Sequence, residues 1–495
     1  MNEERDELQT APDAAERRRG DDLLSRILGE GRLARDELGA AHARQMLSEF
    51  VEQIVDGRLA ASDNTVAAIN SRIEEIDRLI SAQLNEVMHA EEFRKLEASW
   101  RGIAFLTFNT ETGSMIQLRV LNVSKTELSE DLENAQGFEQ SALFRRVYEQ
   151  VFGVFGEVPY GALVGDYEFS NRPEDLALLK ELAAVAAAAH APFITAASPE
   201  LFGWSSFKEM QNTRDLTKIL DSAEYAEWRS LRESEDSKYV GLCLPHTLMR
   251  LPYGAEVQAE TFHFREEVDG RSGENYLWGN AAYSFATRLT DAFAKYHWCA
   301  TIRGYEGGGL VQGLPAQVFI NEEGEPQVRS VTDASINDRR ETELSLNGFI
   351  PLVAFKDTDY AVFLSANSCH QPKQHESFSA NDTSRLAARL PYVFTTSRFA
   401  HYLKLLMRDK IGSFMGRGEV EQYLNQWIDQ YVAVDDDISP ELKAQFPLRG
   451  AKVEVSEVEG NPGAYTAIVY LSPRFLLDEP AASLRLVVDL PAPAK

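Results

Sequence analysis

The chain has 495 residues, more than one compact core usually holds, so two or more domains are expected. Its 50 Lys and Arg residues stand against 77 Asp and Glu residues, and the net charge of -27 makes the phosphate backbone of a nucleic acid an unfavourable partner. The 44% of hydrophobic residues suffices for buried cores and argues against a globally disordered chain.

Cysteine usage and the apolar runs indicate the compartment. Cys243, Cys299 and Cys369 cannot all pair and form no Cys-x-x-Cys motif, which favours buried free thiols in a reducing environment. Residues 1–19 are polar and lack the apolar core of a signal peptide. The longest apolar run, 183–191, is too short to span a bilayer. The sequence therefore predicts a cytoplasmic protein without membrane insertion.

Residues 1–57 are expected to form an N-terminal arm. The first 20 residues are highly charged, and the apolar residues after them recur at spacings of one, three and four, as a one-sided helix requires. Such a helix must bury its apolar face on another surface, so we expect the arm to bind a partner or a neighbouring subunit. The candidate contact residues of the arm are Leu24, Ile27, Leu28, Phe50 and Ile54.

Residues 58–370 are predicted to form a sheet-and-helix region. A long amphipathic helix is expected from Val66 to Val87, and Ser124 with Glu127 forms a capping-box pattern that opens a later helix. Short strands alternate with helices through this region, which indicates an α+β fold class with a mixed α/β body. The predicted strands cover residues 116–123, 161–165, 192–197 and 239–244, and the predicted helices cover 173–190 and 279–299.

Residues 371–495 are predicted to form a separate C-terminal domain. It begins with two helices, over about 397–414 and 419–434. Three strands follow, and the Gly-Asn-Pro-Gly turn at 460–463 predicts that the first two form a hairpin. The strands are predicted over residues 451–459, 464–471 and 484–490.

Residues that could carry chemistry form no convincing constellation. The loop Gly304–Gly309 matches neither G-x-G-x-x-G nor a Walker A motif, and Glu306 would repel phosphate. Cys369, His370 and His375 are close in sequence but lack the second half of a zinc pattern. We therefore predict no catalytic residue, no metal and no cofactor.

Long strings of residues resemble the large sheath subunit of the type VI secretion system, the TssC/VipB/EvpB family. The resemblance extends from about Arg44 to Pro491 and departs locally at Asp333-Ala334, where a Glu and a bulkier aliphatic residue are expected. The strings that carry it are 161–170, 186–199, 232–245, 251–256, 276–286, 298–309, 337–352, 397–415 and 483–491.

The resemblance implies a contractile-tail-sheath fold and a structural function. In this family the large subunit pairs with a small subunit of the TssB/VipA type, and the heterodimers stack as a helical tube around rings of Hcp. The sheath assembles on a baseplate and contracts to propel the inner tube, and a ClpV-type ATPase then dismantles it. A helix of the C-terminal domain is expected to face the tube.

Two sets of assembly residues follow from the predicted C-terminal domain. Its strands alternate, with Val453 and Val455 on one face, and strand edges must be covered or paired, so we predict strand exchange between subunits. The strand-exchange residues are Val453, Val455, Ile468, Tyr470, Leu486 and Val488. On the helix 419–434, an apolar stripe leaves acidic residues to solvent or to a partner. The tube-facing candidates are Glu419, Glu421 and Asp429.

Two alternatives stay open at this point. A sheath protein of a phage-derived contractile particle belongs to the same structural class but needs no small partner. A nucleotide-dependent enzyme would have to use the Gly304–Gly309 loop.

Overall fold

The computed structural model describes the greater part of the chain and divides it into two compact units. The units are Met1–Glu86 with Gln258–Phe264, and Val87–Val257 with Arg265–Lys495. The described residues are 39, 41–46, 48–49, 65–154, 156–254, 262, 264–270, 272–320, 324–409, 416–433, 439–457, 465–474 and 484–489. All five arm candidates, Leu24, Ile27, Leu28, Phe50 and Ile54, lie outside these ranges.

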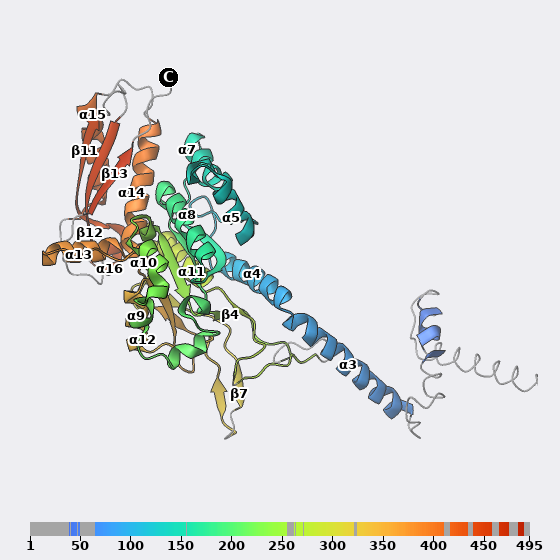
Figure 1. The fold of residues 1–495 in the computed structure, drawn as a ribbon. Coiled ribbons are helices and arrows are strands. Elements are labelled where there is room, and N and C mark those ends of the chain that lie inside the picture. The colour runs from blue at the N-terminus through green and yellow to red at the C-terminus, as the bar shows by residue number, and fades with distance from the viewer. Residues whose placement is uncertain are drawn as a thin grey trace, which may run out of the picture. The chain divides into compact units, whose positions relative to one another are not determined.

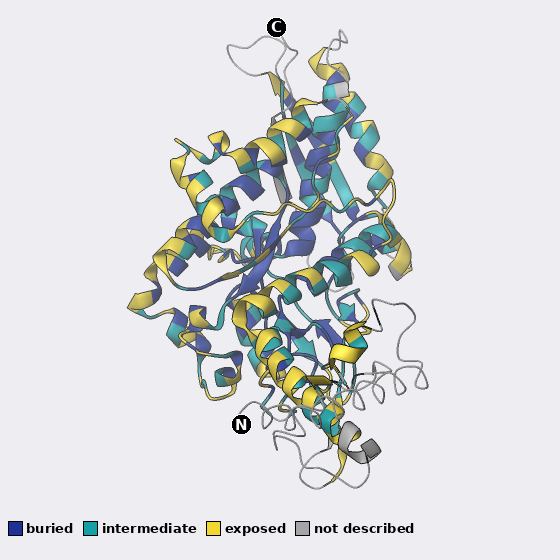
Figure 2. Cartoon of the chain, turned by 90° about the vertical axis from the view of Figure 1, so that its right-hand side faces the viewer, coloured by how far each residue is buried: buried dark blue, intermediate teal, exposed yellow. Residues whose placement is uncertain are grey.

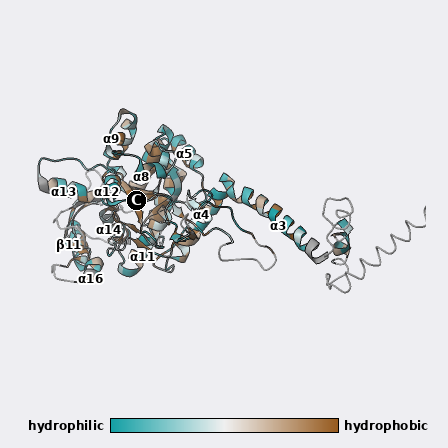
Figure 3. Cartoon of the chain, turned by 90° about the horizontal axis from the view of Figure 1, so that it is seen from below, coloured by the Kyte–Doolittle hydropathy of each residue, from teal (hydrophilic) through white to brown (hydrophobic). Residues whose placement is uncertain are grey.

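The predicted amphipathic helix is confirmed as α3, Thr65–His89, and α4 follows at Glu91–Phe108. Apolar side chains of α3 remain exposed, so this helix carries an uncovered stripe. The exposed side chains are Ile73, Ile76, Leu79, Ile80 and Val87. Figure 3 shows hydrophobic and hydrophilic residues interleaved along α3.

A mixed sheet forms the centre of the larger unit. In the described part of the chain its strand order is β1-β2-β3-β9-β10-β6. The first four of these strands run parallel, and β10 is antiparallel to both of its neighbours. The strands are β1 (Leu163–Phe169), β2 (Phe193–Ala197), β3 (Val240–Leu244), β9 (Phe349–Ala354), β10 (Ala361–Phe363) and β6 (Leu310–Val311). The mixed α/β body expected from the alternation is therefore present.

Helices cover both faces of this sheet. Phe193 joins a core with α8 (Pro173–Ala189), whereas its neighbour Ile194 joins a core with α11 (Ala282–Tyr296). Successive side chains of a strand point to opposite faces, so one strand feeds both cores. Every residue of β2 and β3 is buried, and Figure 2 shows the central strands in the colour of buried residues.

Two sequence predictions in this region need correction. Residues 116–123 alternate like a strand but pair with no strand among the residues the structure describes. The strand predicted at 161–165 begins later, as β1 at Leu163, and continues to Phe169. The capping box at Ser124 and Glu127 is confirmed and opens α5 (Lys125–Asn134).

The remaining helices and strands are short and surround the sheet. The helices are α6 (Ala142–Phe144), α7 (Gln150–Gly153), α9 (Leu216–Leu220), α10 (Ala226–Glu233), α12 (Asp338–Leu346), α13 (Phe378–Ala387) and α16 (Pro440–Gln445). Two small antiparallel pairs are formed by β4 (Thr247–Leu248) with β5 (Trp278–Gly279), and by β7 (Val318–Ile320) with β8 (Pro326–Val328). None of the helices within the described ranges has the length and apolarity that a membrane crossing requires.

The C-terminal portion is a three-stranded antiparallel sheet with two helices (Figure 1). The helices are α14 (Leu390–Asp409) and α15 (Arg417–Ile428), and the strands are β11 (Leu448–Glu457), β12 (Tyr465–Pro473) and β13 (Leu484–Asp489). The predicted hairpin is confirmed, with Val453 opposite Val469 and Val469 opposite Leu486. One face of the sheet packs on Leu424 and Ile428 of α15 in a common core.

Candidate functional site

The predicted strand-exchange residues do not share one surface. Val453 and Val455 are buried in the core beneath α15, and Leu486 packs against the same core. Ile468 and Tyr470 stand on the opposite face of the sheet and are half-buried. Val488 lies in β13 opposite Ala467, but its side chain is outside the described set. What these residues share is the backbone ladder of one small sheet.

The outer edge of β11 is already satisfied by side chains of α15. Asn425 accepts a hydrogen bond from the Val453 amide at 2.9 Å and donates one to its carbonyl at 2.8 Å. Four residues earlier on the same helix face, the Glu421 carboxylate accepts from the Val455 amide at 3.0 Å. The helix thus substitutes for a neighbouring strand, and this edge of the sheet is closed to strand addition.

The outer edge of β13 is not closed by α15, although α14 packs near this strand. Its strand pairs with β12 alone among the segments that the structure describes. The backbone groups of Val453 point at Asn425, away from β12, so those of Val469 opposite it point toward β13. Val469 therefore pairs through its backbone with Leu486. The next residue of β13, Val487, points its amide and carbonyl outward. Val487 therefore presents an amide and a carbonyl on the only edge of this described sheet that α15 leaves open.

The three tube-facing candidates have different environments. Glu419 is exposed, and its carboxylate accepts from the Gly416 amide at 3.0 Å, which satisfies the first turn of α15. Asp429 is exposed just beyond the helix. Glu421 is half-buried, and its carboxylate accepts from the Val455 amide of β11 at 3.0 Å, so it is less available to a partner than the other two. Facing the tube stays a prediction for Glu419, Glu421 and Asp429.

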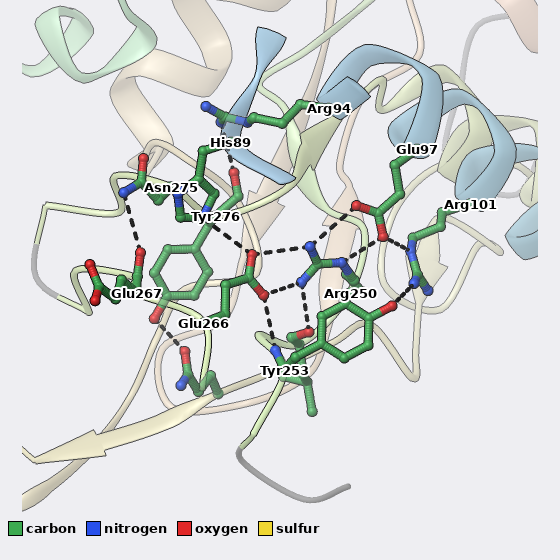
Figure 4. Close-up of polar contacts among 12 residues, drawn as sticks. His89, Arg94, Glu97, Arg101, Arg250, Tyr253, Glu266, Glu267, Asn275 and Tyr276 are labelled. Atoms are coloured by element: carbon green, nitrogen blue, oxygen red, sulfur yellow. Dashed lines mark hydrogen bonds and ion pairs between the residues drawn. The ribbon is translucent and has the colours of Figure 1, made fainter. Parts of the chain in front are cut away.

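A buried ion-pair cluster joins α4 to the segment that follows β4 (Figure 4). The Arg250 guanidinium lies between two carboxylates, with Nε 2.7 Å from Glu97 Oε1 and Nη2 3.0 Å from Glu266 Oε1. The side chains of Arg250 and Glu266 are almost fully buried. On the rim of the cluster, Arg101 donates to Glu97 at 2.7 Å and to the Tyr253 hydroxyl at 2.9 Å.

The electrostatics of this cluster favour the ionised states of Glu97 and Arg250. Burial alone would raise the pKa of Glu97, but hydrogen bonds from Arg250 and Arg101 lower it below the ordinary value. Burial also opposes the charge on Arg250, and its two carboxylate partners raise its pKa nevertheless. Both carboxylates are held in bidentate geometry, so the cluster acts as a rigid fastening rather than as a proton-transfer site.

A second charged cluster lies where β1 and β3 end. His246 places Nδ1 2.8 Å from Asp333 Oδ2 and Nε2 2.9 Å from Glu168 Oε1. Burial would lower the pKa of His246, yet the two carboxylates raise it to about 10. Both ring nitrogens are engaged with carboxylates, so neither can act as a general base. The arrangement connects three segments of the chain and offers no catalytic group.

The charge state of His246 leads to a pH prediction. Its folded pKa of about 10 exceeds the unfolded value of 6.5, so its stabilisation is complete below pH 6.5 and declines as the pH rises toward 10. We expect His246→Gln to lower the urea midpoint of the protein most at pH 6, and by less at pH 8 and pH 10. A deficit that stays constant with pH would contradict this assignment.

The glycine loop weighed as a phosphate site is used for packing. The amide of Gly304 donates to the Phe363 carbonyl at 2.8 Å, and the amide of Gly309 donates to the Gly304 carbonyl at 2.9 Å. A Cβ on Gly308, whose φ is +87°, would lie 2.2 Å from the Thr301 carbonyl oxygen. The amides at the two ends of the loop are therefore occupied by the strand β10 and by the loop itself.

The cysteine and histidine residues near position 370 have environments of their own. Cys369 is buried, which raises the pKa of its thiol to about 12. His370 Nδ1 lies 2.9 Å from the Ser234 carbonyl, and His375 is held through its backbone by Asn381. No group of three potential metal ligands occurs within the described ranges.

The comparison with known proteins identifies the family. The EvpB/VC_A0108 tail sheath N-terminal domain matches residues 70–370, and the EvpB/VC_A0108 tail sheath gpW/gp25-like domain matches residues 379–490. The chain belongs to this sheath family. It is 48% identical over 447 residues to the type VI secretion system sheath protein TssC1 of Pseudomonas aeruginosa, with 90% of each chain covered. The predicted resemblance is confirmed, and the chain is a structural subunit of a type VI secretion sheath, not an enzyme.

Sequence reasoning missed both buried charged clusters. Arg250 lies 153 positions from Glu97, and His246 lies 87 positions from Asp333, so no local spacing links them. One signal was present, because Asp333 is the position where the sheath resemblance predicts a Glu. The structure shows that this shorter carboxylate is one of the two that hold His246.

Proposed function

We propose that this subunit pairs with a small sheath subunit of the TssB/VipA type and that the heterodimers polymerise helically around an Hcp tube in the cytoplasm. The sheath would grow from a baseplate, contract to propel the tube, and be dismantled by a ClpV-type ATPase. The observation that carries the proposal is the tandem match of two sheath domains to a chain whose C-terminal sheet has one closed and one open edge.

The open edge of β13 is the proposed site of strand exchange. A strand donated by a neighbouring subunit would pair with the outward backbone of Val487 and extend the sheet. Closure of the β11 edge by Asn425 supports a single direction of addition. Contacts of this kind that repeat from subunit to subunit without closing a ring give a helical filament.

The chain divides its roles by region in this proposal. Residues 1–57 supply the arm that reaches a partner or neighbour, residues 58–370 form the sheath body, and residues 371–495 form the strand-exchange domain. The exposed apolar stripe of α3 supports partner binding in the N-terminal half, since a stripe of this kind gains free energy when it is covered. In the C-terminal domain, exposed Glu419 and Asp429 provide weak, salt-sensitive contacts to the tube.

Co-expression tests the proposal directly. The chain produced with the small subunit should elute as a stable heterodimer or pellet as large assemblies, whereas the chain alone should be poorly behaved. Large assemblies of the chain without any partner would instead favour a sheath of the phage-derived type. A monodisperse chain that ignores the small subunit would contradict the proposed pairing.

A further inference from the structure

The segment that follows α4 has the sequence pattern of a strand but lacks a strand's partners. Residues 117–122 make no backbone hydrogen bond with any residue in the described ranges. The segment is held at its ends, by the Gly113 amide on the Ile116 carbonyl and by the Tyr167 hydroxyl on the Val123 carbonyl. Its exposed side chains include Val120, which is 70% exposed. A partly apolar stretch with unused backbone groups is a template for strand pairing.

β1, at the edge of the central sheet, is a second segment that could pair with an added strand. The backbone groups of Leu163, Gly165 and Phe169 point toward β2, as their hydrogen bonds to the Pro192 carbonyl, the Thr195 hydroxyl and the Ser198 amide show. The alternate residues Val164 and Asp166 therefore point outward, where no strand lies among the described segments. Farther along, Lys125 covers the outward carbonyl of Glu168 at 2.7 Å and ends the open edge.

Both segments line one cavity of about 620 Å³. Val120 and Leu121 contribute to the lining from the first segment, and Val164 and Gly165 contribute from β1. Leu121 is 46% exposed and Val164 is 37% exposed, so part of this apolar lining is accessible. A second cavity of about 230 Å³ adjoins it and shares Val164 in its lining. A cavity bounded by two open backbone edges has the form of a place for one added strand.

The charge of the lining indicates the chemistry of that strand. Arg119 and Arg146 line the larger cavity, and Glu157 is its one acidic residue. Glu157 is already paired with Arg119 at 3.1 Å, which leaves the exposed Arg146 as an uncompensated positive charge in the lining. Arg146 therefore favours an acidic residue on the occupant beside it, whereas the exposed Asp166 on the β1 edge disfavours one there.

We propose that the groove between residues 117–122 and β1 receives one β-strand of the small sheath partner, apolar at alternate positions and acidic where it meets Arg146. The strand would pair with the outward backbone of Val164 and Asp166 and with the unused backbone of 117–122, adding to the central sheet. This inference rests on the proposed heterodimer and names its interface. It is separate from the subunit-to-subunit exchange at β13.

Val120→Pro tests the groove with little risk to folding. Val120 is 70% exposed and its amide makes no hydrogen bond within the described chain, so proline removes only a donor that the partner strand would use. Val120→Thr keeps the amide and a β-branched side chain and serves as the matched control. We expect at least tenfold weaker binding of the purified small subunit to Val120→Pro and near-unchanged binding to Val120→Thr. Equal binding by both variants would overturn the groove assignment.

Hydrogen exchange identifies the occupant. In the co-purified complex, the amides of 117–122, Val164 and Asp166 should exchange more slowly than in the chain alone. If the same protection arises in the chain alone as its concentration rises, a second copy occupies the groove and the assignment to the small partner is overturned. If the wild-type chain does not bind the small subunit at all, the proposed heterodimer fails with it. If the small subunit binds Val120→Pro as tightly as it binds the wild-type chain, the groove assignment fails and the proposed heterodimer stands.

Discussion

Replacing Arg250 by Met should cost the protein about 3–5 kcal/mol of stability, because the change removes the buried cation that Glu97 and Glu266 share and leaves Glu97 with Arg101 alone. Methionine fills a similar volume without the charge, so the loss reports the uncompensated carboxylates rather than a cavity. Urea unfolding of the complex with the small subunit would measure it. The triple variant Arg250→Met, Glu97→Gln, Glu266→Gln should recover much of the stability.

The matched control is Arg101→Met on the rim of the same cluster. Arg101 pairs with the same carboxylate but is 36% exposed, so its loss should cost less than about 1 kcal/mol. Acid provides a second check. Arg250 holds the pKa of Glu97 below 4.5, so the stabilisation is present above that pH and is lost as the pH falls through the lowered pKa. Equal losses of stability from Arg250→Met and Arg101→Met would show that burial does not determine how much these ion pairs contribute to stability.

Val487→Pro should abolish sheath assembly while leaving the heterodimer intact. The Val487 amide points away from β12, so proline removes a donor from the open edge without breaking the subunit's own ladder. The pelleted fraction of co-expressed protein should fall at least tenfold. Val487→Ala keeps the amide and should assemble, which separates the backbone contribution from the side chain.

Proline at Ile468 gives a different and less selective result. Ile468 lies in the central strand β12, next to Val469, whose backbone groups point toward β13. Because the direction alternates along a strand, the amide and carbonyl of Ile468 point toward β11. Proline there would disrupt the subunit's own hairpin as well as any exchange. Assembly by Val487→Pro at the wild-type level would place strand exchange elsewhere, whatever Ile468→Pro does.

Much of the fold was predictable because its signals are local. The stripe from Val66 to Val87 predicted α3, the pair Ser124 and Glu127 predicted the start of α5, and the Gly-Asn-Pro-Gly turn predicted the C-terminal hairpin. Each of these depends on residues within a few turns or strand lengths of one another. The family itself followed from long strings of residues, and the tandem domain matches confirm it.

The remaining features depend on contacts between distant segments. Residues 116–123 alternate as a strand does, but no partner strand within this described chain completes them, so the period alone gave the wrong assignment. Glu421 looked like a surface acid on an amphipathic helix, and only the position of β11 shows that its carboxylate binds the Val455 amide. Sequence periodicity identifies the face of a helix but not the strand edge that lies against it.

Negative-stain electron microscopy of the chain co-expressed with its small subunit tests the central claim most directly. The account predicts hollow, helically ordered tubes for the wild-type pair and for Val487→Ala, and discrete heterodimers without tubes for Val487→Pro. Discrete particles or closed rings from the wild-type pair, with no helical tubes under any condition, would contradict the assignment of this chain as a polymerising sheath subunit.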